Sequence, residues 1–159
     1  MGQEIERKFL VNTDRLGELT DGEVMRQGYI DTRSLATVRA RIAGERGWLT
    51  LKGGNRDGVR SEFEYEIPIE DARQIIDELC CGPVISKTRY RREYQGYTWE
   101  IDVFEEDNAG LIVAEVELGD VTENPPLPDW VTEEVTSDPR YYNSQLARRP
   151  FQQWPPSER

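Results

Sequence analysis

Hydrophobic and polar residues alternate with a period of two along most of the chain, a pattern typical of β-strands. The alternating segments are 3–11, 27–31, 37–43, 47–53, 60–68, 86–94, 97–105 and 111–119. Short glycine-containing turns at 44–47, 95–96 and 108–110 join neighbouring segments, and such turns connect antiparallel strands. The pattern therefore predicts about eight strands in an antiparallel sheet.

Helical spacing of apolar residues occurs in a few places. An amphipathic helix is predicted over 70–81, where Ala72, Ile76 and Leu79 recur on one side and the Gly-Pro pair at 82–83 ends the run. A shorter helix is expected after Asn12, and a third from 138 onward, where an aspartate cap precedes a proline. The predicted fold class is α+β, mainly antiparallel sheet with a few helices laid against it.

The polar positions of these strands are mostly charged, and each strand carries nearly a single sign. Residues two apart in a strand share a face, so Glu62 and Glu64 stand together opposite Phe63, and Lys87 stands with Arg89. Two interpretations remain open. The charged face is either the solvated side of an open sheet, or the lining of a closed eight-stranded barrel whose apolar face lies under helices.

Composition and charge narrow the chemistry. The 159 residues fit one domain, placed at 1–147, with a C-terminal tail at 148–159 whose end is expected to fray. The net charge of −11 disfavours duplex nucleic acid as a partner, and the absence of histidine excludes imidazole-based catalysis. No segment reads as a membrane span or signal peptide, so we expect a cytoplasmic protein. The adjacent cysteines, Cys80 and Cys81, are expected to be reduced thiols.

Lysine is rare among the 20 basic residues. The three lysines, Lys8, Lys52 and Lys87, all lie in predicted strands rather than scattered over the surface. A barrel lined by bases on some walls and carboxylates on others needs ligands that neutralise both. A polyanion fits the bases, and divalent cations fit the acids.

An ordered set of seven motifs over residues 3–147 resembles the CYTH domain family, the triphosphate tunnel metalloenzymes, in its short bacterial form. The motifs are Glu4-Ile-Glu6-Arg-Lys8, Val38-Arg39-Ala-Arg41, Leu49-Thr-Leu-Lys52, Glu62-Phe-Glu64-Tyr, Lys87-Thr-Arg89-Tyr, Glu100-Ile-Asp102 and Ala114-Glu115-Val-Glu117. One such motif occurs by chance on many charged strands, whereas the ordered set is specific.

The resemblance implies an eight-stranded antiparallel tunnel that binds a triphosphate with Mg²⁺ or Mn²⁺. The implied metal ligands are Glu4, Glu6 and Glu117, with Asp102 and Glu115 as further candidates. The implied phosphate clamp is Lys8, Arg39, Arg41, Lys52, Lys87 and Arg89, and Arg91 joins this substrate-binding set because it shares their face. We expect the catalytic residues to be Glu4, Glu6, Glu117 and Lys52, with one of the carboxylates orienting the attacking water. Glu62 and Glu64 match acidic tunnel positions whose role stays open.

The family resemblance also implies several activities: inorganic triphosphatase, thiamine triphosphatase, RNA 5′-triphosphatase and class IV adenylyl cyclase. Metal-dependent hydrolysis of inorganic tripolyphosphate is favoured, because so short a chain leaves little room for a nucleoside pocket. The alternative outside enzymes is a module that binds triphosphate or polyphosphate and has an incomplete metal site. A homodimer is compatible with the sequence.

Counting charges on the inferred inner face gives seven bases and nine acids. The bases are Lys8, Arg39, Arg41, Lys52, Lys87, Arg89 and Arg91; the acids are Glu4, Glu6, Glu62, Glu64, Glu66, Glu100, Asp102, Glu115 and Glu117. Because acids exceed bases, we expect metal and triphosphate to bind with positive coupling. The aromatic residues Trp48, Trp99 and Trp130 are expected to pack in the core or cover it. Tyr29 could approach the tunnel mouth, although packing is favoured for a tyrosine in a sheet.

Overall fold

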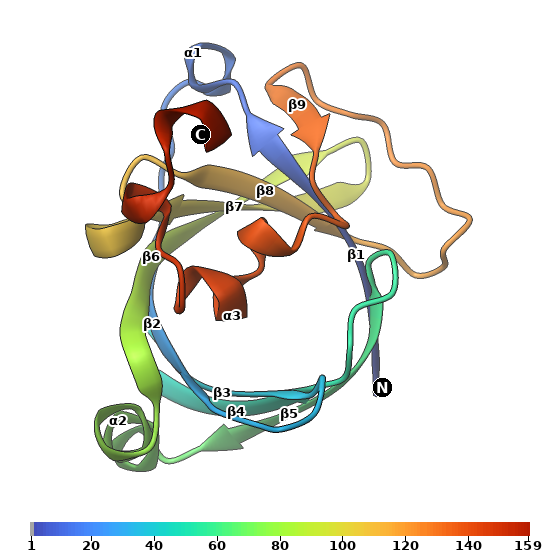
Figure 1. Ribbon diagram of the computed structural model, residues 1–159. Coiled ribbons are helices and arrows are strands. Elements are labelled where there is room, and N and C mark those ends of the chain that lie inside the picture. The colour runs from blue at the N-terminus through green and yellow to red at the C-terminus, as the bar shows by residue number, and fades with distance from the viewer. Residues whose placement is uncertain (1) are drawn as a thin grey trace.

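Eight antiparallel strands close into a barrel in the computed structural model, which describes residues 2–159 (Figure 1). Closure occurs because β1 pairs with β8 on one side and with β5 on the other, so the first and last strands of the order leave no open edge. The barrel strands are β1 (Gln3–Val11), β2 (Glu23–Ile30), β3 (Thr37–Ala43), β4 (Arg46–Lys52), β5 (Val59–Ile67), β6 (Cys81–Tyr94), β7 (Tyr97–Phe104) and β8 (Ile112–Glu117). The predicted closed barrel is confirmed.

A ninth strand and several short helices complete the fold. The ninth strand, β9 (Val131–Glu134), pairs with the outer part of β1. The helices are α1 (Thr13–Leu16), α2 (Ile69–Glu78) and α3 (Asn143–Leu146), and the 3-10 helices are η1 (Glu106–Asn108), η2 (Pro139–Tyr141), η3 (Phe151–Gln153) and η4 (Pro156–Glu158). No described helix is long and apolar enough to cross a membrane.

Several element boundaries differ from the sequence prediction. β9 was not predicted, because its four residues are too few to show alternation. β2 begins four residues earlier than expected, and β6 begins at Cys81, ahead of the Gly-Pro pair that signals the end of a helix. The predicted third helix is broken into η2 and α3, because the backbone of Tyr142 between them is extended.

Apolar residues on the outward faces of β1, β7 and β8 form one hydrophobic core. Phe9, Trp99, Ile101 and Val116 are buried there, and Trp130 from the proline-rich connection covers them. Trp99 lies edge-on to Trp130 with ring centroids 5.7 Å apart. The predicted packing of these two tryptophans is confirmed. Because their strands alternate, this outer packing turns the charged residues of the same strands toward the barrel axis.

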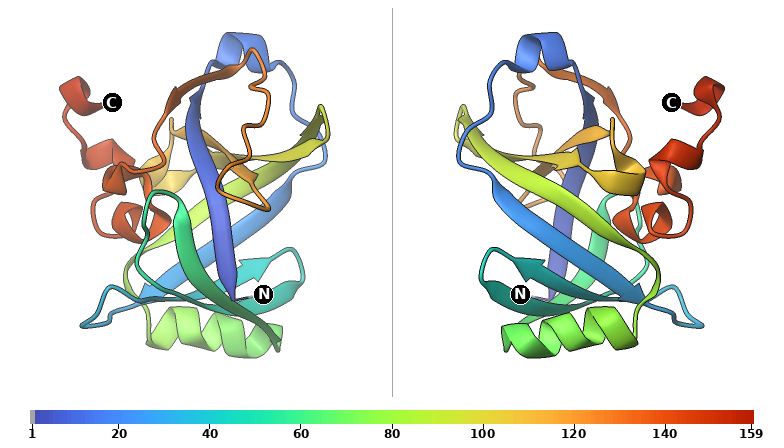
Figure 2. Two further views of the ribbon diagram at one scale, coloured as in Figure 1. Left: turned by 90° about the vertical axis from the view of Figure 1, so that its right-hand side faces the viewer. Right: turned by 90° about the vertical axis from the view of Figure 1, so that its left-hand side faces the viewer.

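A second core fills one end of the barrel. Ile85, Phe104 and Val113 continue the inner faces of β6, β7 and β8, and they pack against Tyr141 and Trp154 from the C-terminal segment. Figure 2 shows this segment, in red, at one end of the barrel, while α2 lies along the outside of the wall. The helices therefore do not all pack on the outside as predicted, since η2 and α3 close one end of the tunnel.

The end of the chain is also more regular than the predicted frayed tail. Residues 151–153 and 156–158 form 3-10 turns. Trp154 is 1% exposed, and its indole nitrogen donates to the carbonyl of Arg149 at 3.0 Å. Arg140 stacks between Tyr141 and Trp154, at 5.5 and 5.3 Å from the two ring centroids. The tail therefore fastens the segment that closes the barrel.

Candidate active site

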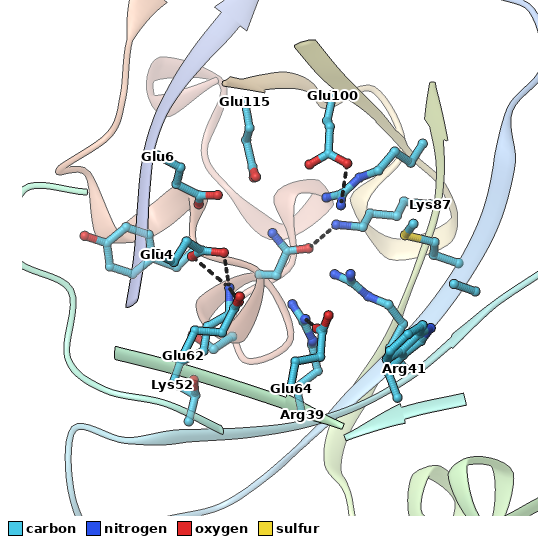
Figure 3. Close-up of a pocket in the computed structure, with 18 of the residues that line it drawn as sticks. Glu4, Glu6, Arg39, Arg41, Lys52, Glu62, Glu64, Lys87, Glu100 and Glu115 are labelled. Carbon is cyan, nitrogen blue, oxygen red and sulfur yellow. Dashed lines mark hydrogen bonds and ion pairs between the residues drawn. The ribbon is translucent and has the colours of Figure 1, made fainter. Parts of the chain in front are cut away.

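The barrel encloses a cavity of about 400 Å³ that is lined mostly by charged side chains (Figure 3). Nine basic side chains line it: Lys8, Arg39, Arg41, Arg46, Lys52, Arg60, Lys87, Arg89 and Arg91. Eight acidic side chains line it: Glu4, Glu6, Glu23, Glu62, Glu64, Glu100, Glu115 and Glu117. The two signs nearly balance, so the predicted excess of acids on the inner face is wrong.

Arg41 on β3 is the most weakly paired base of the cavity. Its side chain is buried, and the one hydrogen bond recorded for its guanidinium runs from Nε to the Gln27 Oε1 on β2, at 2.7 Å. No carboxylate of residues 2–159 forms an ion pair with it. Burial, together with the nearby Arg39 and Arg89, lowers the pKa of Arg41 to about 9. A buried guanidinium without a counter-charge favours binding of an anion.

Asp102 on β7 holds two further bases in place from a position outside the cavity lining. Its side chain is fully buried, and its oxygens accept hydrogen bonds from Lys87 Nζ at 2.7 Å and from Arg89 Nε and Nη2 at 2.7 and 2.9 Å. Burial alone opposes ionisation, but Arg89 and Lys87 hold the pKa of Asp102 far below its ordinary value. Asp102 does not line the cavity, so we assign it as a positioning residue rather than a metal ligand.

Glu6 and Glu117 form the opposite, acidic wall. They are directly opposed in the ladder between β1 and β8, and both line the cavity. Burial raises the pKa of Glu6 well above its ordinary value, and the neighbouring Glu115 and Glu4 raise it further. Burial and Glu4 likewise raise the pKa of Glu117. No base of residues 2–159 forms an ion pair with either carboxylate.

The remaining charged residues form mixed pairs between these two walls. Lys52 Nζ lies 3.0 Å from Glu4 and 3.1 Å from Glu62. Lys8 Nζ lies 3.4 Å from Glu115, and although burial opposes ionisation, this base and Arg89 hold the pKa of Glu115 far below its ordinary value. The paired charges therefore lie between Arg41, a base without an ion-pair partner, and Glu6 and Glu117, two acids without one.

A divalent cation fits the acidic wall on chemical grounds. Carboxylate oxygens are the ligands that Mg²⁺ and Mn²⁺ prefer, and Glu6 with Glu117 offers two carboxylates that lack a counter-charge. Within residues 2–159, however, no three acidic or cysteine side chains converge closely enough to hold a metal by themselves. Mg²⁺ commonly takes one or two carboxylates and completes its shell with water and substrate phosphates, which matches this arrangement.

The structure brings most of the predicted site residues into one cavity. Lys8, Arg39, Arg41, Lys52, Lys87 and Arg89 line it together with Glu4, Glu6, Glu115 and Glu117. Arg91 lies at its margin with half of its side chain exposed, 3.4 Å from Glu100. Glu66, predicted to face inward, is exposed and does not line the cavity; it pairs at 2.7 Å with Arg46, which does.

Several residues that line the cavity were not predicted from the sequence. Arg60 shares the parity of Glu62 and Glu64 and was detectable from that pattern. Tyr29 lines the cavity and also packs against the second core, so both expectations for it hold, whereas Trp48 was expected only to pack and lines the cavity. Tyr142 and Asn143 also line it, and no sequence signal marks them, because they reach the cavity only through the docking of the C-terminal segment.

A closed barrel whose interior holds a base and two acids without ion-pair partners is typical of a protein that binds a charged ligand inside its fold. The family model for the CYTH domain matches residues 2–149, and the chain belongs to this family.

Named relatives share nearly the whole chain. An inorganic triphosphatase of Acetivibrio thermocellus is 46% identical over 151 residues, which cover 95% of this chain and 97% of that protein. An inorganic triphosphatase of Nitrosomonas europaea is 38% identical, covering 91% and 96%. A crystal structure described as an inorganic triphosphatase superposes with a TM-score of 0.64 at 35% identity, covering 92% of this chain and 95% of that one.

Proposed function

We propose that this protein is a metal-dependent inorganic triphosphatase that hydrolyses tripolyphosphate inside the barrel. Two relatives that span the whole chain carry the name inorganic triphosphatase, and one of them shares 46% of its residues with this chain. The proposed cation is Mg²⁺ or Mn²⁺, because the available ligands are carboxylates. The cytoplasmic location and the homodimer stay predictions from the sequence.

One observation supports the proposal: Arg41 and Glu6 face the same cavity, and neither forms an ion pair with another described residue. A base that needs an anion and an acid that needs a cation are both satisfied by an anion with its divalent cation. Tripolyphosphate provides several negative charges along a short chain, which suits a lumen lined by nine bases.

Different residues of the cavity have different roles in phosphoryl transfer. Such transfer needs charge neutralisation on the phosphoryl oxygens and a water held in line with the leaving group. Arg39, Arg41 and Arg89 donate hydrogen bonds to phosphate oxygens, and arginine does so in bidentate fashion. Glu6 and Glu117 would hold the cation, which, when bound, supplies positive charge to the phosphoryl oxygens. A carboxylate of this wall accepts a hydrogen bond from the attacking water and orients it.

Lys52 joins the two walls. Its ammonium contacts Glu4 and Glu62 at 3.0 and 3.1 Å, so it is held at the boundary between the acids and the bases. A compact charge at this position neutralises phosphate oxygens close to the acidic wall. We propose that Lys52 acts at the scissile linkage.

The experiment is a phosphate-release assay on tripolyphosphate, ATP and thiamine triphosphate, each with Mg²⁺, with Mn²⁺ and with neither. We expect cation-dependent release with the highest kcat/KM for tripolyphosphate. An equal or higher kcat/KM for ATP or thiamine triphosphate, or cyclic AMP as the main product from ATP, contradicts the substrate assignment. Tight binding of tripolyphosphate without any turnover identifies a binding module instead.

A further inference from the structure

The C-terminal segment brings an amide into the basic wall of the tunnel. Asn143 is the first residue of α3, and its side chain lines the cavity. Its Oδ1 accepts a hydrogen bond from Lys87 Nζ at 2.9 Å and another from Gln27 Nε2 at 3.2 Å. Figure 3 draws the bond from Lys87 as a dashed line into the middle of the cavity. α3 is therefore tied to β6 and β2 through one carbonyl oxygen.

Arg41 fixes the orientation of both amides in this network. Arg41 can only donate, so the atom of Gln27 that meets Arg41 Nε must be Oε1, at 2.7 Å. Gln27 then presents Nε2, a donor, to Asn143. The amide nitrogen of Gln27 can only donate, so the atom of Asn143 that meets it must be the oxygen, and Lys87 Nζ donates to the same oxygen.

In this orientation the amide nitrogen of Asn143 is available to a ligand in the cavity. Nδ2 carries two N–H donors, and neither finds an acceptor among residues 2–159. The oxygen at the other end of the same planar group is held against the wall by Lys87 and Gln27, so Nδ2 is the part of the amide that can reach a ligand in the lumen. Lys87 is 1% exposed and Gln27 is fully buried, so the anchor of this amide is shielded from water.

The rest of the segment is rigidly fastened. Lys8 Nζ donates to the carbonyl of Tyr141 at 3.0 Å, and Leu146 is fully buried. Tyr141 packs edge-on against Trp154 with ring centroids 5.3 Å apart. An amide held by buried neighbours on both sides loses little entropy when it binds a ligand, so its hydrogen bond is preorganised.

We propose that Asn143 is a substrate-binding residue whose Nδ2 donates a hydrogen bond to a phosphate oxygen of the triphosphate at the closed end of the tunnel. The proposal rests on the proposed function, because it requires a triphosphate in the cavity. A neutral donor contributes to binding without adding another charge beside Lys87, Arg41 and Arg89. It also makes the C-terminal segment a part of the binding site rather than only a closure of the barrel.

The test is the dissociation constant of tripolyphosphate, measured by calorimetry without metal, for wild type, Asn143→Ala, Lys87→Met and the double variant. A hydrogen bond to a charged group corresponds to about a 10- to 100-fold change in affinity, so Asn143→Ala is expected to weaken binding by that factor. If Asn143 contacts the phosphate itself, the same weakening persists in the Lys87→Met background. A loss that disappears in that background shows that Asn143 acts only through Lys87 and overturns the proposal.

Asn143→Asp provides a second, independent decision should Lys87→Met not fold. It keeps the acceptor for Lys87 and Gln27, removes both donors and adds a negative charge. Both changes weaken binding if Asn143 faces the phosphate, whereas affinity equal to wild type overturns the proposal. Gln145→Ala, on the exposed side of the same helix, is the matched control and should bind as wild type does. Thermal unfolding of each variant confirms that it is folded.

Failure of the inference and failure of the proposed function give different results. If wild type neither binds nor hydrolyses tripolyphosphate, the proposed function is wrong. If wild type hydrolyses it and folded Asn143→Ala retains the dissociation constant and KM of wild type within twofold, only the role of Asn143 is wrong.

Discussion

Glu6 on β1 lies directly opposite Glu117 on β8, and the two carboxylates face one cavity without a basic partner from residues 2–159. Like charges at opposed positions of an antiparallel ladder are destabilising. Burial raises the pKa of both residues, and nearby glutamates raise each further. A divalent cation held by both carboxylates would offset the repulsion from Glu4 and Glu115 on Glu6 and from Glu4 and Glu100 on Glu117.

Removing either charge should separate anion binding from turnover. Glu6→Gln and Glu117→Gln each delete a negative charge that repels triphosphate, so we expect metal-free binding of tripolyphosphate to be unchanged or tighter. Turnover with Mg²⁺ should fall by roughly 100-fold or more, because a cation ligand is lost. Calorimetric titration with and without Mg²⁺, combined with phosphate release, measures both effects.

Glu133→Gln is the matched control for these variants, because Glu133 is exposed on β9 and far from the cavity lining. It should leave both measurements unchanged. If Glu6→Gln and Glu117→Gln are folded but lose metal-free binding of tripolyphosphate, the two carboxylates serve to position the basic wall, and their assignment as metal ligands is wrong.

Arg41→Ala should cost activity without costing stability. Arg41 is buried without a carboxylate partner, so its removal leaves no acid uncompensated and relieves repulsion with Arg39 and Arg89. We expect kcat/KM for tripolyphosphate to fall by roughly 10- to 1000-fold, while the melting temperature changes little, because the relieved repulsion offsets the hydrogen bond lost by the buried Gln27 Oε1. Arg148→Ala, on an exposed residue paired with Asp31, should change neither quantity. Full activity of folded Arg41→Ala would refute the assignment of this wall to phosphate binding.

Asp102→Asn should lower the stability of the fold. Asp102 accepts hydrogen bonds from Lys87 and Arg89, and removing one member of a buried ion network typically costs about 3–5 kcal/mol of unfolding free energy. The loss should be the same with and without Mg²⁺, because Asp102 does not reach the cavity. Denaturant unfolding under both conditions measures it. A variant of unchanged stability that has lost Mg²⁺ affinity would restore Asp102 as a metal ligand.

The sequence predicted the barrel and most of its lining because side chains alternate with a period of two in every strand. That period places Glu4, Glu6 and Lys8 on one face, but the charge pattern alone left open whether this face is solvated or interior, and the resemblance to the CYTH family favoured the interior. Parity alone cannot say how far a side chain reaches toward the axis. It therefore treats Asp102 and Glu100 alike, although Asp102 is recessed behind Lys87 and Arg89 and Glu100 lines the cavity.

The C-terminal contribution depends on tertiary contacts that leave no local pattern. Asn143 reaches the tunnel because Trp154, eleven positions later, is buried in the same core as Tyr141 and Leu146. Residues 138–146 read as one helix in the sequence, yet the extended backbone of Tyr142 divides it and lets Tyr142 and Asn143 face the cavity. Only the folded chain shows that these residues belong to the site.

Lys87 should take up a proton when tripolyphosphate binds near neutral pH. Its ammonium is fully buried, and this burial, with repulsion from Arg89 and Arg41, outweighs the attraction of Asp102 and lowers the pKa of Lys87 to about 7. Because this is below the ordinary lysine value of about 10.4, the unfolded chain binds more protons between these pH values. The contribution of Lys87 to unfolding free energy therefore increases as pH rises from about 7 to about 10.4.

A bound polyanion favours the charged form of Lys87 and raises its pKa again. At pH 8, binding of tripolyphosphate to wild type should therefore be accompanied by uptake of more protons than binding to Lys87→Met, which cannot titrate there. Calorimetry in two buffers of different ionisation enthalpy measures the difference, and protonation of the substrate itself cancels between the two proteins. Equal proton uptake by both proteins would show that Lys87 is already charged in the free enzyme, held so by Asp102.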